Sequence, residues 1–207
     1  MTSQDDGRQE KWDNFFDFAG PDNIYISGVK TPKNRDKVGM NLTQIAQMRG
    51  ISPADAVFDL LLDEENDVSM VDYYGTEDQV GTLLQRPEMN VCTDGLYTDH
   101  PHPRGYGTYP RILGRYVREQ KLLPLESAVR KMTGRPAEVF RIRQRGILRE
   151  GNYADITVFD PDRIRDTATF ERPAMYPEGI LHVCVNGVME VMDGEYTGRP
   201  SGCALRK

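Results

Sequence analysis

The sequence predicts an α/β fold in which the last βα units of a (β/α)8 barrel are followed by a small antiparallel β module. Strand and helix patterns alternate over about two thirds of the chain, which is typical of βα units that feed a parallel sheet or barrel. From Gly146 onward, short strand patterns follow one another instead. A complete barrel takes roughly 250 residues, whereas this chain has 207. We therefore expect the end of a barrel, divided into a polar N-terminal lead-in (1–22), the last βα units (23–145) and the β module (146–207).

The helices of the first part are predicted from their start and stop signals. Asn41 and Gln44 have the spacing of a capping box, and Gly50 ends the helix that this box begins. The dipeptide Ser52-Pro53 begins the next helix, with serine as the N-cap and proline in the first turn. A short helix is expected from Thr76 through Leu84. Strand composition marks three further segments, Asn23–Val29, Asp67–Tyr74 and Met89–Thr93.

The second part begins with two helical patterns and ends in strands. Helices are expected over Tyr106–Gln120 and Pro124–Thr133, and Gly134 and Pro136 should break the pattern. The dipeptide Asn186-Gly187 is a strong signal for a type I′ hairpin turn between two strands. The strand candidates are Ile147-Leu148, Ala154–Asp160, Ile180–Val185 and Val188–Met192.

Composition excludes several classes of protein. The net charge is −6 with both signs mixed, and the arginine-rich stretch 141–149 lacks interleaved aromatic residues, so we expect no nucleic-acid partner. No apolar run reaches the roughly 18 residues of a membrane span, and the N-terminus lacks a secretory apolar segment. The three cysteines are far apart and form no CxxC pair. A reduced cytoplasmic protein that does not bind membranes is the simplest interpretation.

The segment from Asp94 to Arg104 is the best candidate for chemistry. It sets a carboxylate at the end of a short apolar strand, before Gly95, and a guanidinium within reach of the same space. In a (β/α)8 barrel, catalytic groups lie at the carboxyl ends of the strands. A carboxylate there can move a proton, and an arginine can hold an anionic group of a substrate. The alternatives are a turn aspartate for Asp94 and a surface ion pair for Arg104.

Other candidates have simpler explanations. His100 and His102 have His-x-His spacing, but their proline-rich loop favours a packing role over metal ligation. His182 alternates within a strand and is expected to be structural, and Cys92 is expected in the core. Tyr106, together with Tyr109, could line a pocket, although aromatic residues at helix starts usually pack.

Several motifs together resemble the N-acyl-D-amino-acid deacylases (D-aminoacylases) of the amidohydrolase superfamily. The similarity is dense from about Asn23 to the C-terminus. The motifs that carry it are Thr93-Asp94-Gly95, His102-Pro103-Arg104 with the following Gly-Tyr-Gly-Thr-Tyr-Pro-Arg-Ile-Leu-Gly, Ala128-Val-Arg-Lys-Met-Thr-Gly, and Gly151-Asn-Tyr-Ala-Asp-Ile-Thr-Val-Phe-Asp-Pro-Asp.

The resemblance implies a metal-dependent hydrolase that splits linear amides of N-acyl-D-amino acids. Asp94 matches the family's catalytic aspartate, which accepts a proton from the attacking water and passes it to the leaving amine; direct ligation of the metal by Asp94 is a weaker possibility. Arg104 matches the arginine that pairs with the substrate carboxylate. Tyr106 is a further substrate-binding candidate. The family's zinc, or another divalent metal, would be held mainly by residues outside this chain, because no histidine here matches a family ligand.

The chain is expected to be the C-terminal part of such an enzyme, either as the small subunit of a hetero-oligomer whose second subunit carries the front of the barrel or as a fragment of a longer enzyme. Two other functions stay open. The chain could be a structural subunit that completes a partner's barrel without a catalytic group. It could also be a cyclic-amide hydrolase of the hydantoinase or dihydroorotase kind. The preferred acyl group, amino acid and metal are not predicted by the sequence.

Overall fold

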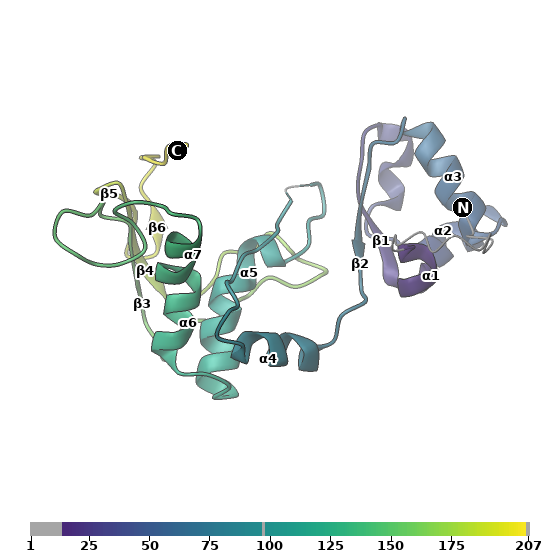
Figure 1. Cartoon of the computed structure of the whole chain (residues 1–207). Coiled ribbons are helices and arrows are strands. Elements are labelled where there is room, and N and C mark those ends of the chain that lie inside the picture. The colour runs from purple at the N-terminus through teal and green to yellow at the C-terminus, as the bar shows by residue number, and fades with distance from the viewer. Residues whose placement is uncertain (1–13, 97, 206–207) are drawn as a thin grey trace. The chain divides into compact units, whose positions relative to one another are not determined.

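The computed structural model of the chain describes residues 14–96 and 98–205 (Figure 1). Contacts divide the chain into two units, residues 1–74 and residues 75–207. This division does not coincide with the boundaries expected after residues 22 and 145, which remain predictions. The polar lead-in falls largely on residues 1–13, outside the described residues. Among the described residues, no helix is both long and apolar enough to cross a membrane.

The first unit is a β hairpin packed with short helices. Its two strands pair antiparallel, with Ile24 opposite Asp72 and Val29 opposite Val68. The core is formed by buried residues of the hairpin and of two helices, including Ile26, Ile45 and Leu60. The elements are α1 (Phe15–Ala19), the 3₁₀ helix η1 (Pro21–Asn23), β1 (Ile24–Val29), the 3₁₀ helix η2 (Pro32–Lys37), α2 (Leu42–Arg49), α3 (Pro53–Asp63) and β2 (Val68–Asp72).

The caps predicted for this unit are confirmed. The Asn41 side chain accepts a hydrogen bond from the Gln44 amide at 2.8 Å, and the Gln44 side chain accepts one from the Asn41 amide at 2.9 Å. Gly50 ends α2 in the left-handed conformation, at φ 67°. Ser52 caps α3 through the amide of Asp55 at 3.1 Å. These local signals satisfy backbone donors that a helix start leaves unpaired.

The first unit contains a buried carboxylate, that of Glu64, which was not predicted from the sequence. Glu64 is fully buried and accepts hydrogen bonds from the amide and hydroxyl of Thr31, both at 2.6 Å, and from the side chain of Asn34 at 2.5 Å. Burial alone would raise the pKa of Glu64, but these hydrogen bonds hold it below its ordinary value. Glu64 therefore joins the end of α3 to the segment that follows β1.

The second unit combines helices with a four-stranded antiparallel sheet in the order β3-β4-β5-β6. Its core includes Leu84, Val91, Ile112, Tyr116 and Ile164. The elements are α4 (Glu77–Gln85), α5 (Arg104–Arg111), the π-helix η3 (Ile112–Glu119), α6 (Leu125–Met132), α7 (Gly134–Val139), β3 (Ile156–Phe159), β4 (Ile180–Val185), β5 (Val188–Met192) and β6 (Glu195–Tyr196).

The antiparallel module is confirmed, and it includes one strand, β6, that the sequence did not predict. Asn186 and Gly187 have φ values of 51° and 83°, as a type I′ turn requires. Asp193 and Gly194, at 52° and 81°, make a second turn that leads into β6. The strand expected at Ile147-Leu148 is wrong, because these residues belong to an exposed loop without strand pairing.

The strand expected at Met89–Thr93 is also wrong. This segment lies in no sheet, and the Val91 amide instead donates its hydrogen bond to the Lys131 carbonyl in the last turn of α6, at 3.0 Å. Both sheets of the described residues are antiparallel, so these residues contain no parallel pair of the kind a barrel needs. Cys92 is exposed and not a core residue, which corrects the expectation based on that strand.

The expected break at Gly134 and Pro136 is a helix instead. Pro136 is the third residue of α7, where a backbone amide has no intrahelical partner to lose. The helix ends in a Schellman motif, in which Ile142 donates to the Ala137 carbonyl at 2.8 Å and Arg141 donates to the Glu138 carbonyl at 3.2 Å. Arg141 has φ 56° at the position that usually carries glycine. Proline in a first turn therefore does not stop a helix.

Candidate functional site

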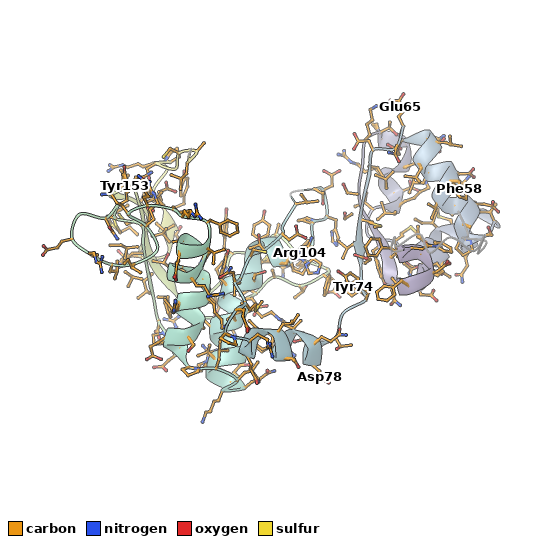
Figure 2. The ribbon with its side chains drawn as sticks, viewed as in Figure 1. Phe58, Glu65, Tyr74, Asp78, Arg104 and Tyr153 are labelled. Atoms are coloured by element: carbon orange, nitrogen blue, oxygen red, sulfur yellow. The ribbon has the colours of Figure 1, made fainter. Side chains whose placement is uncertain are left out.

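The structure brings the two leading candidates together in an ion pair. Nη2 of Arg104 lies 3.0 Å from Oδ2 of Asp94. The Asp94 side chain is 82% exposed and that of Arg104 is 40% exposed, so both reach an open surface. Arg104 is the first residue of α5, and Figure 2 marks it there. A carboxylate and a guanidinium thus share one site on the second unit.

Local backbone geometry aims Asp94 at this surface. Asp94 has φ 46°, a left-handed conformation that aspartate tolerates better than most residues. The amide of Gly95 donates to the Thr93 hydroxyl at 3.2 Å, which holds the turn. A Cβ on Gly95 would lie only 2.9 Å from the Cα of Gly105. Glycine at position 95 therefore lets the turn approach the start of α5 closely enough for the ion pair.

The guanidinium of Arg104 is only partly paired within the part of the chain that the structure describes. Its Nε is buried and has no hydrogen-bond partner among the described residues, while Nη2 faces Asp94. The Arg104 amide donates to Nδ1 of His102 at 2.9 Å. A guanidinium that is 40% exposed, beside an exposed carboxylate, can bind an anionic group through its planar donors.

The two histidines of the preceding loop pack against Phe170. Nε2 of His100 lies 2.7 Å from the Phe170 carbonyl oxygen. The rings of His102 and Phe170 meet edge to face, with centroids 5.0 Å apart. Both imidazoles thus pack the loop, the role that the sequence analysis favoured. His182 accepts a hydrogen bond from the Asp193 amide at 3.2 Å within the β module.

A network of charged and polar side chains at the end of α5 was not predicted from the sequence. Glu77 lies 2.9 Å from Arg111 and accepts a short hydrogen bond from the Tyr116 hydroxyl, and Arg111 also bonds Asp166 at 3.1 Å. Burial alone would raise the pKa of Glu77, but the bonds from Tyr116 and Arg111 hold it below its ordinary value. The network ties α4, α5 and η3 together and so supports the helix that carries Arg104.

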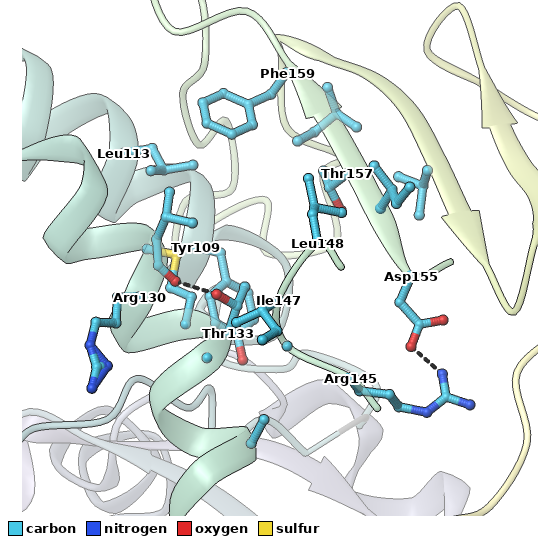
Figure 3. A pocket seen from close by; sticks show the side chains of 18 of the residues that line it. Tyr109, Leu113, Arg130, Thr133, Arg145, Ile147, Leu148, Asp155, Thr157 and Phe159 are labelled. Carbon is cyan, nitrogen blue, oxygen red and sulfur yellow. Dashed lines mark hydrogen bonds and ion pairs between the residues drawn. The ribbon is translucent and has the colours of Figure 1, made fainter. Parts of the chain in front are cut away.

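A large apolar pocket of about 1840 Å³ lies elsewhere on the second unit (Figure 3). Tyr109 and Leu113 line it from the helices, Phe159 from β3, and Ile147 and Leu148 from the loop between them. Tyr106 also lines it, whereas Asp94 and Arg104 do not. The pocket and the ion pair are therefore separate features.

Tyr106 and Tyr109 differ in surroundings. The ring of Tyr106 meets that of Tyr176 edge to face, with centroids 6.2 Å apart. Burial raises the pKa of Tyr109, and nearby Cys92 adds to the effect. Tyr106 follows Arg104 by two residues on α5 and lines the pocket, so the ion pair and the pocket are neighbours along this helix.

The described residues do not form a metal site by themselves. No group of three or more histidine, cysteine, aspartate or glutamate side chains among them is arranged to hold an ion. Asp94 supplies one exposed carboxylate, which is paired with Arg104. A structural or catalytic metal needs at least three protein ligands in the usual zinc sites. Any metal of this site would therefore need ligands beyond these residues.

The segment that carries the Asp94–Arg104 site matches a known hydrolase family. A family model described as the amidohydrolase family matches residues 39–190. This chain is a member of the amidohydrolase family, as the motifs around Asp94 and Arg104 predicted.

Similar proteins include several deacylases of D-amino-acid derivatives. An N-acyl-D-aspartate deacylase of Alcaligenes xylosoxydans xylosoxydans is 40% identical over 160 residues, 77% of this chain and 29% of the relative. A D-aminoacylase of the same organism is 39% identical over 170 residues, 82% of this chain and 34% of the relative. The crystal structure of an N-acyl-D-glutamate deacylase from Bordetella bronchiseptica, complexed with zinc and a phosphonate inhibitor that mimics the tetrahedral intermediate, matches with a TM-score of 0.77 and 37% identity over 85% of this chain and 36% of that chain. The chain spans about a third of the length of these relatives.

Proposed function

We propose that this chain supplies the catalytic carboxylate of a metal-dependent deacylase, which hydrolyses the amide bond of N-acyl-D-amino acids or similar linear amides. It would act as the C-terminal part, or the small subunit, of that enzyme. The observation that carries the proposal is the Asp94–Arg104 pair, at 3.0 Å on an open surface. The deacylase relatives support the choice of substrate.

Each residue of the site has a chemical role in this proposal. Asp94 accepts a proton from the attacking water and returns it to the leaving amine, as one carboxylate can do in sequence. Arg104 holds the carboxylate of the amino acid with its planar donors. Tyr106 contributes to substrate binding from the first turn of α5. A substrate carboxylate would take over the contact that Arg104 now makes with Asp94 and leave Asp94 free to act as a base.

Zinc or another divalent metal would be held mainly by residues outside this chain, with Asp94 as a possible further ligand. The zinc in the Bordetella bronchiseptica structure supports a metal-dependent reaction. When bound, such a metal supplies an acidified water at neutral pH.

We further propose that the remainder of the barrel, from a second subunit or a longer polypeptide, covers the pocket of the second unit. The apolar side chains that line the pocket include Ile147, 51% exposed, and Leu148, 80% exposed. A large apolar surface of this kind favours a protein partner. The free state of Cys92, Cys184 and Cys203 agrees with a cytoplasmic location.

The test combines this chain with the missing part of a relative. The chain is mixed with a polypeptide that comprises the region of the N-acyl-D-glutamate deacylase that it does not match, with zinc added. We expect release of free amine from N-acetyl-D-glutamate or N-acetyl-D-aspartate. Asp94→Asn should lower turnover by about 10²- to 10⁴-fold, the usual contribution of acid–base catalysis.

Other outcomes would replace the proposal. If Asp94→Asn mixes retain full turnover, the chain is a structural subunit and the partner performs the chemistry. If dihydroorotate or hydantoin is hydrolysed in preference to the linear amides, the enzyme is a cyclic-amide hydrolase. Activity of the purified chain alone would remove the need for a partner.

A further inference from the structure

One residue of α6 holds both ends of the segment that leads to Asp94. The Lys131 ammonium donates a short hydrogen bond to the Arg86 carbonyl. The Lys131 carbonyl accepts the Val91 amide at 3.0 Å. Residues 86–91 are thus attached to the last turn of α6 at their first and last positions, and Asp94 follows three residues later.

Lys131 makes these contacts from an unusual environment. Lysine is rarely buried unless it is paired, yet Lys131 is only 7% exposed, and Val91 beside it is 5% exposed. Burial lowers the pKa of Lys131, the charge of Arg135 lowers it further, and Glu88 opposes both. A buried ammonium is a weak source of stability, and hydrophobic replacement of buried charges is often neutral or stabilising.

A second cation strengthens the attachment. Arg135, at the start of α7, donates from Nε and Nη2 to the Glu88 carbonyl at 3.2 and 2.8 Å. Two cations therefore converge on carbonyl groups of the turn between α4 and Asp94. The Asp94 side chain itself is fixed by its ion pair with Arg104 on the exposed side.

We propose that Lys131 is a positioning residue, which fixes the backbone of residues 86–91 and thereby the place where Asp94 meets Arg104. This inference rests on the proposed function of Asp94. It assigns the buried ammonium to the geometry of the site rather than to the stability of the fold. Loss of the ammonium removes the attachment at Arg86 but keeps the backbone bond from Val91, so it should loosen residues 86–91 and the Asp94 segment that follows them, and leave the second unit folded.

The direct test is amide hydrogen exchange of the purified chain, compared with its urea unfolding midpoint. In Lys131→Met, we expect the amides of residues 89–95 to exchange about 10- to 100-fold faster, as expected for loss of a hydrogen bond to a charged group. The urea midpoint should stay the same or rise. Lys131→Arg, which keeps a charged donor, should restore slow exchange. Arg163→Met, which removes an exposed cation of the same unit, should change neither quantity.

Three results for Lys131→Met would overturn the inference. Unchanged exchange at residues 89–95 would show that the ammonium does not hold this segment. Faster exchange throughout the second unit together with a lower urea midpoint, or failure of the variant to fold, would make Lys131 a structural residue.

Kinetics in the reconstituted enzyme separate this inference from the proposed function. Lys131→Met should lower kcat at least tenfold while KM for the N-acyl-D-amino acid stays within about twofold, because Arg104 still binds the carboxylate. Full turnover in Asp94→Asn would remove the proposed function, and the exchange experiment would still decide whether Lys131 holds the segment. A normal kcat in Lys131→Met, with Asp94→Asn inactive, would refute the positioning role alone.

Discussion

Gly95→Ala should separate the two halves of the candidate site. An added Cβ at this position would lie 2.9 Å from the Cα of Gly105 and 3.5 Å from its amide nitrogen, both backbone atoms that cannot rotate away. The third close atom is the Thr93 hydroxyl oxygen, at 3.4 Å. The turn that carries Asp94 would therefore have to move away from the start of α5.

The size of the effect follows from this overlap. Ordinary contacts of a Cβ begin near 3.4 Å, so the backbone must yield by about half an ångström. Overpacking of this kind costs about 1–3 kcal/mol of the free energy of unfolding. Since a displacement of about 1 Å can lower a rate by about 100-fold, we expect a loss of roughly tenfold in kcat/KM.

Gly105→Ala is the matched control. A Cβ on Gly105 meets no atom within 4 Å, and alanine in a helix is favoured over glycine by up to about 1 kcal/mol. Urea unfolding and amine release would be measured for both variants in parallel. Gly95→Ala with wild-type stability and rate, or equal losses in the two variants, would refute the close approach as the cause of the Asp94–Arg104 geometry.

Three further predictions test the site and its support. Arg104→Ala should lower kcat/KM for N-acetyl-D-leucine about 10- to 100-fold more than for its uncharged amide; equal losses would argue against a carboxylate clamp. Arg141→Gly should raise the free energy of unfolding by about 1 kcal/mol and the melting temperature by roughly 3–5 °C, because glycine relieves the left-handed φ of 56°; no gain in a thermal melt would contradict this. The folded pKa of Glu77 lies below its ordinary value of about 4.3, so its contribution to stability is full above that value and is lost as the pH falls through the folded pKa. The urea midpoint of Glu77→Gln should therefore depend less on pH between about 5 and about 3 than that of the wild type, and parallel pH profiles would be inconsistent with the network.

Features that depend on a few neighbouring residues could be predicted from the sequence. The box of Asn41 and Gln44 and the Asn186-Gly187 turn are settled by groups within four residues of one another. The approach of Asp94 to Arg104 could also be predicted from the sequence, because one short loop joins the two residues. The contact between Glu77 and Arg111 joins residues 34 positions apart and left no local signal beyond an acid in the first turn of a helix.

Other features required a partner that the local pattern does not specify. The composition of Met89–Thr93 suits a strand, but the Val91 amide bonds to the end of a helix 40 residues later, and the segment pairs with no other strand of the described residues. A strand needs a neighbouring strand as hydrogen-bond partner, and composition does not specify that partner. The prediction that Pro136 breaks a helix was wrong for another reason. Proline disrupts the interior of a helix but is tolerated in its first turn.

The central claim is that Asp94 transfers the proton in amide hydrolysis. The most direct measurement is kcat for N-acetyl-D-glutamate in the reconstituted enzyme, compared among wild type, Asp94→Asn and Asp99→Asn. Asparagine tolerates the left-handed backbone at position 94, so the variant should fold and assemble. We predict a fall in kcat of at least 100-fold for Asp94→Asn and a near-normal value for Asp99→Asn, an aspartate of the same loop. A wild-type kcat in Asp94→Asn would contradict the claim.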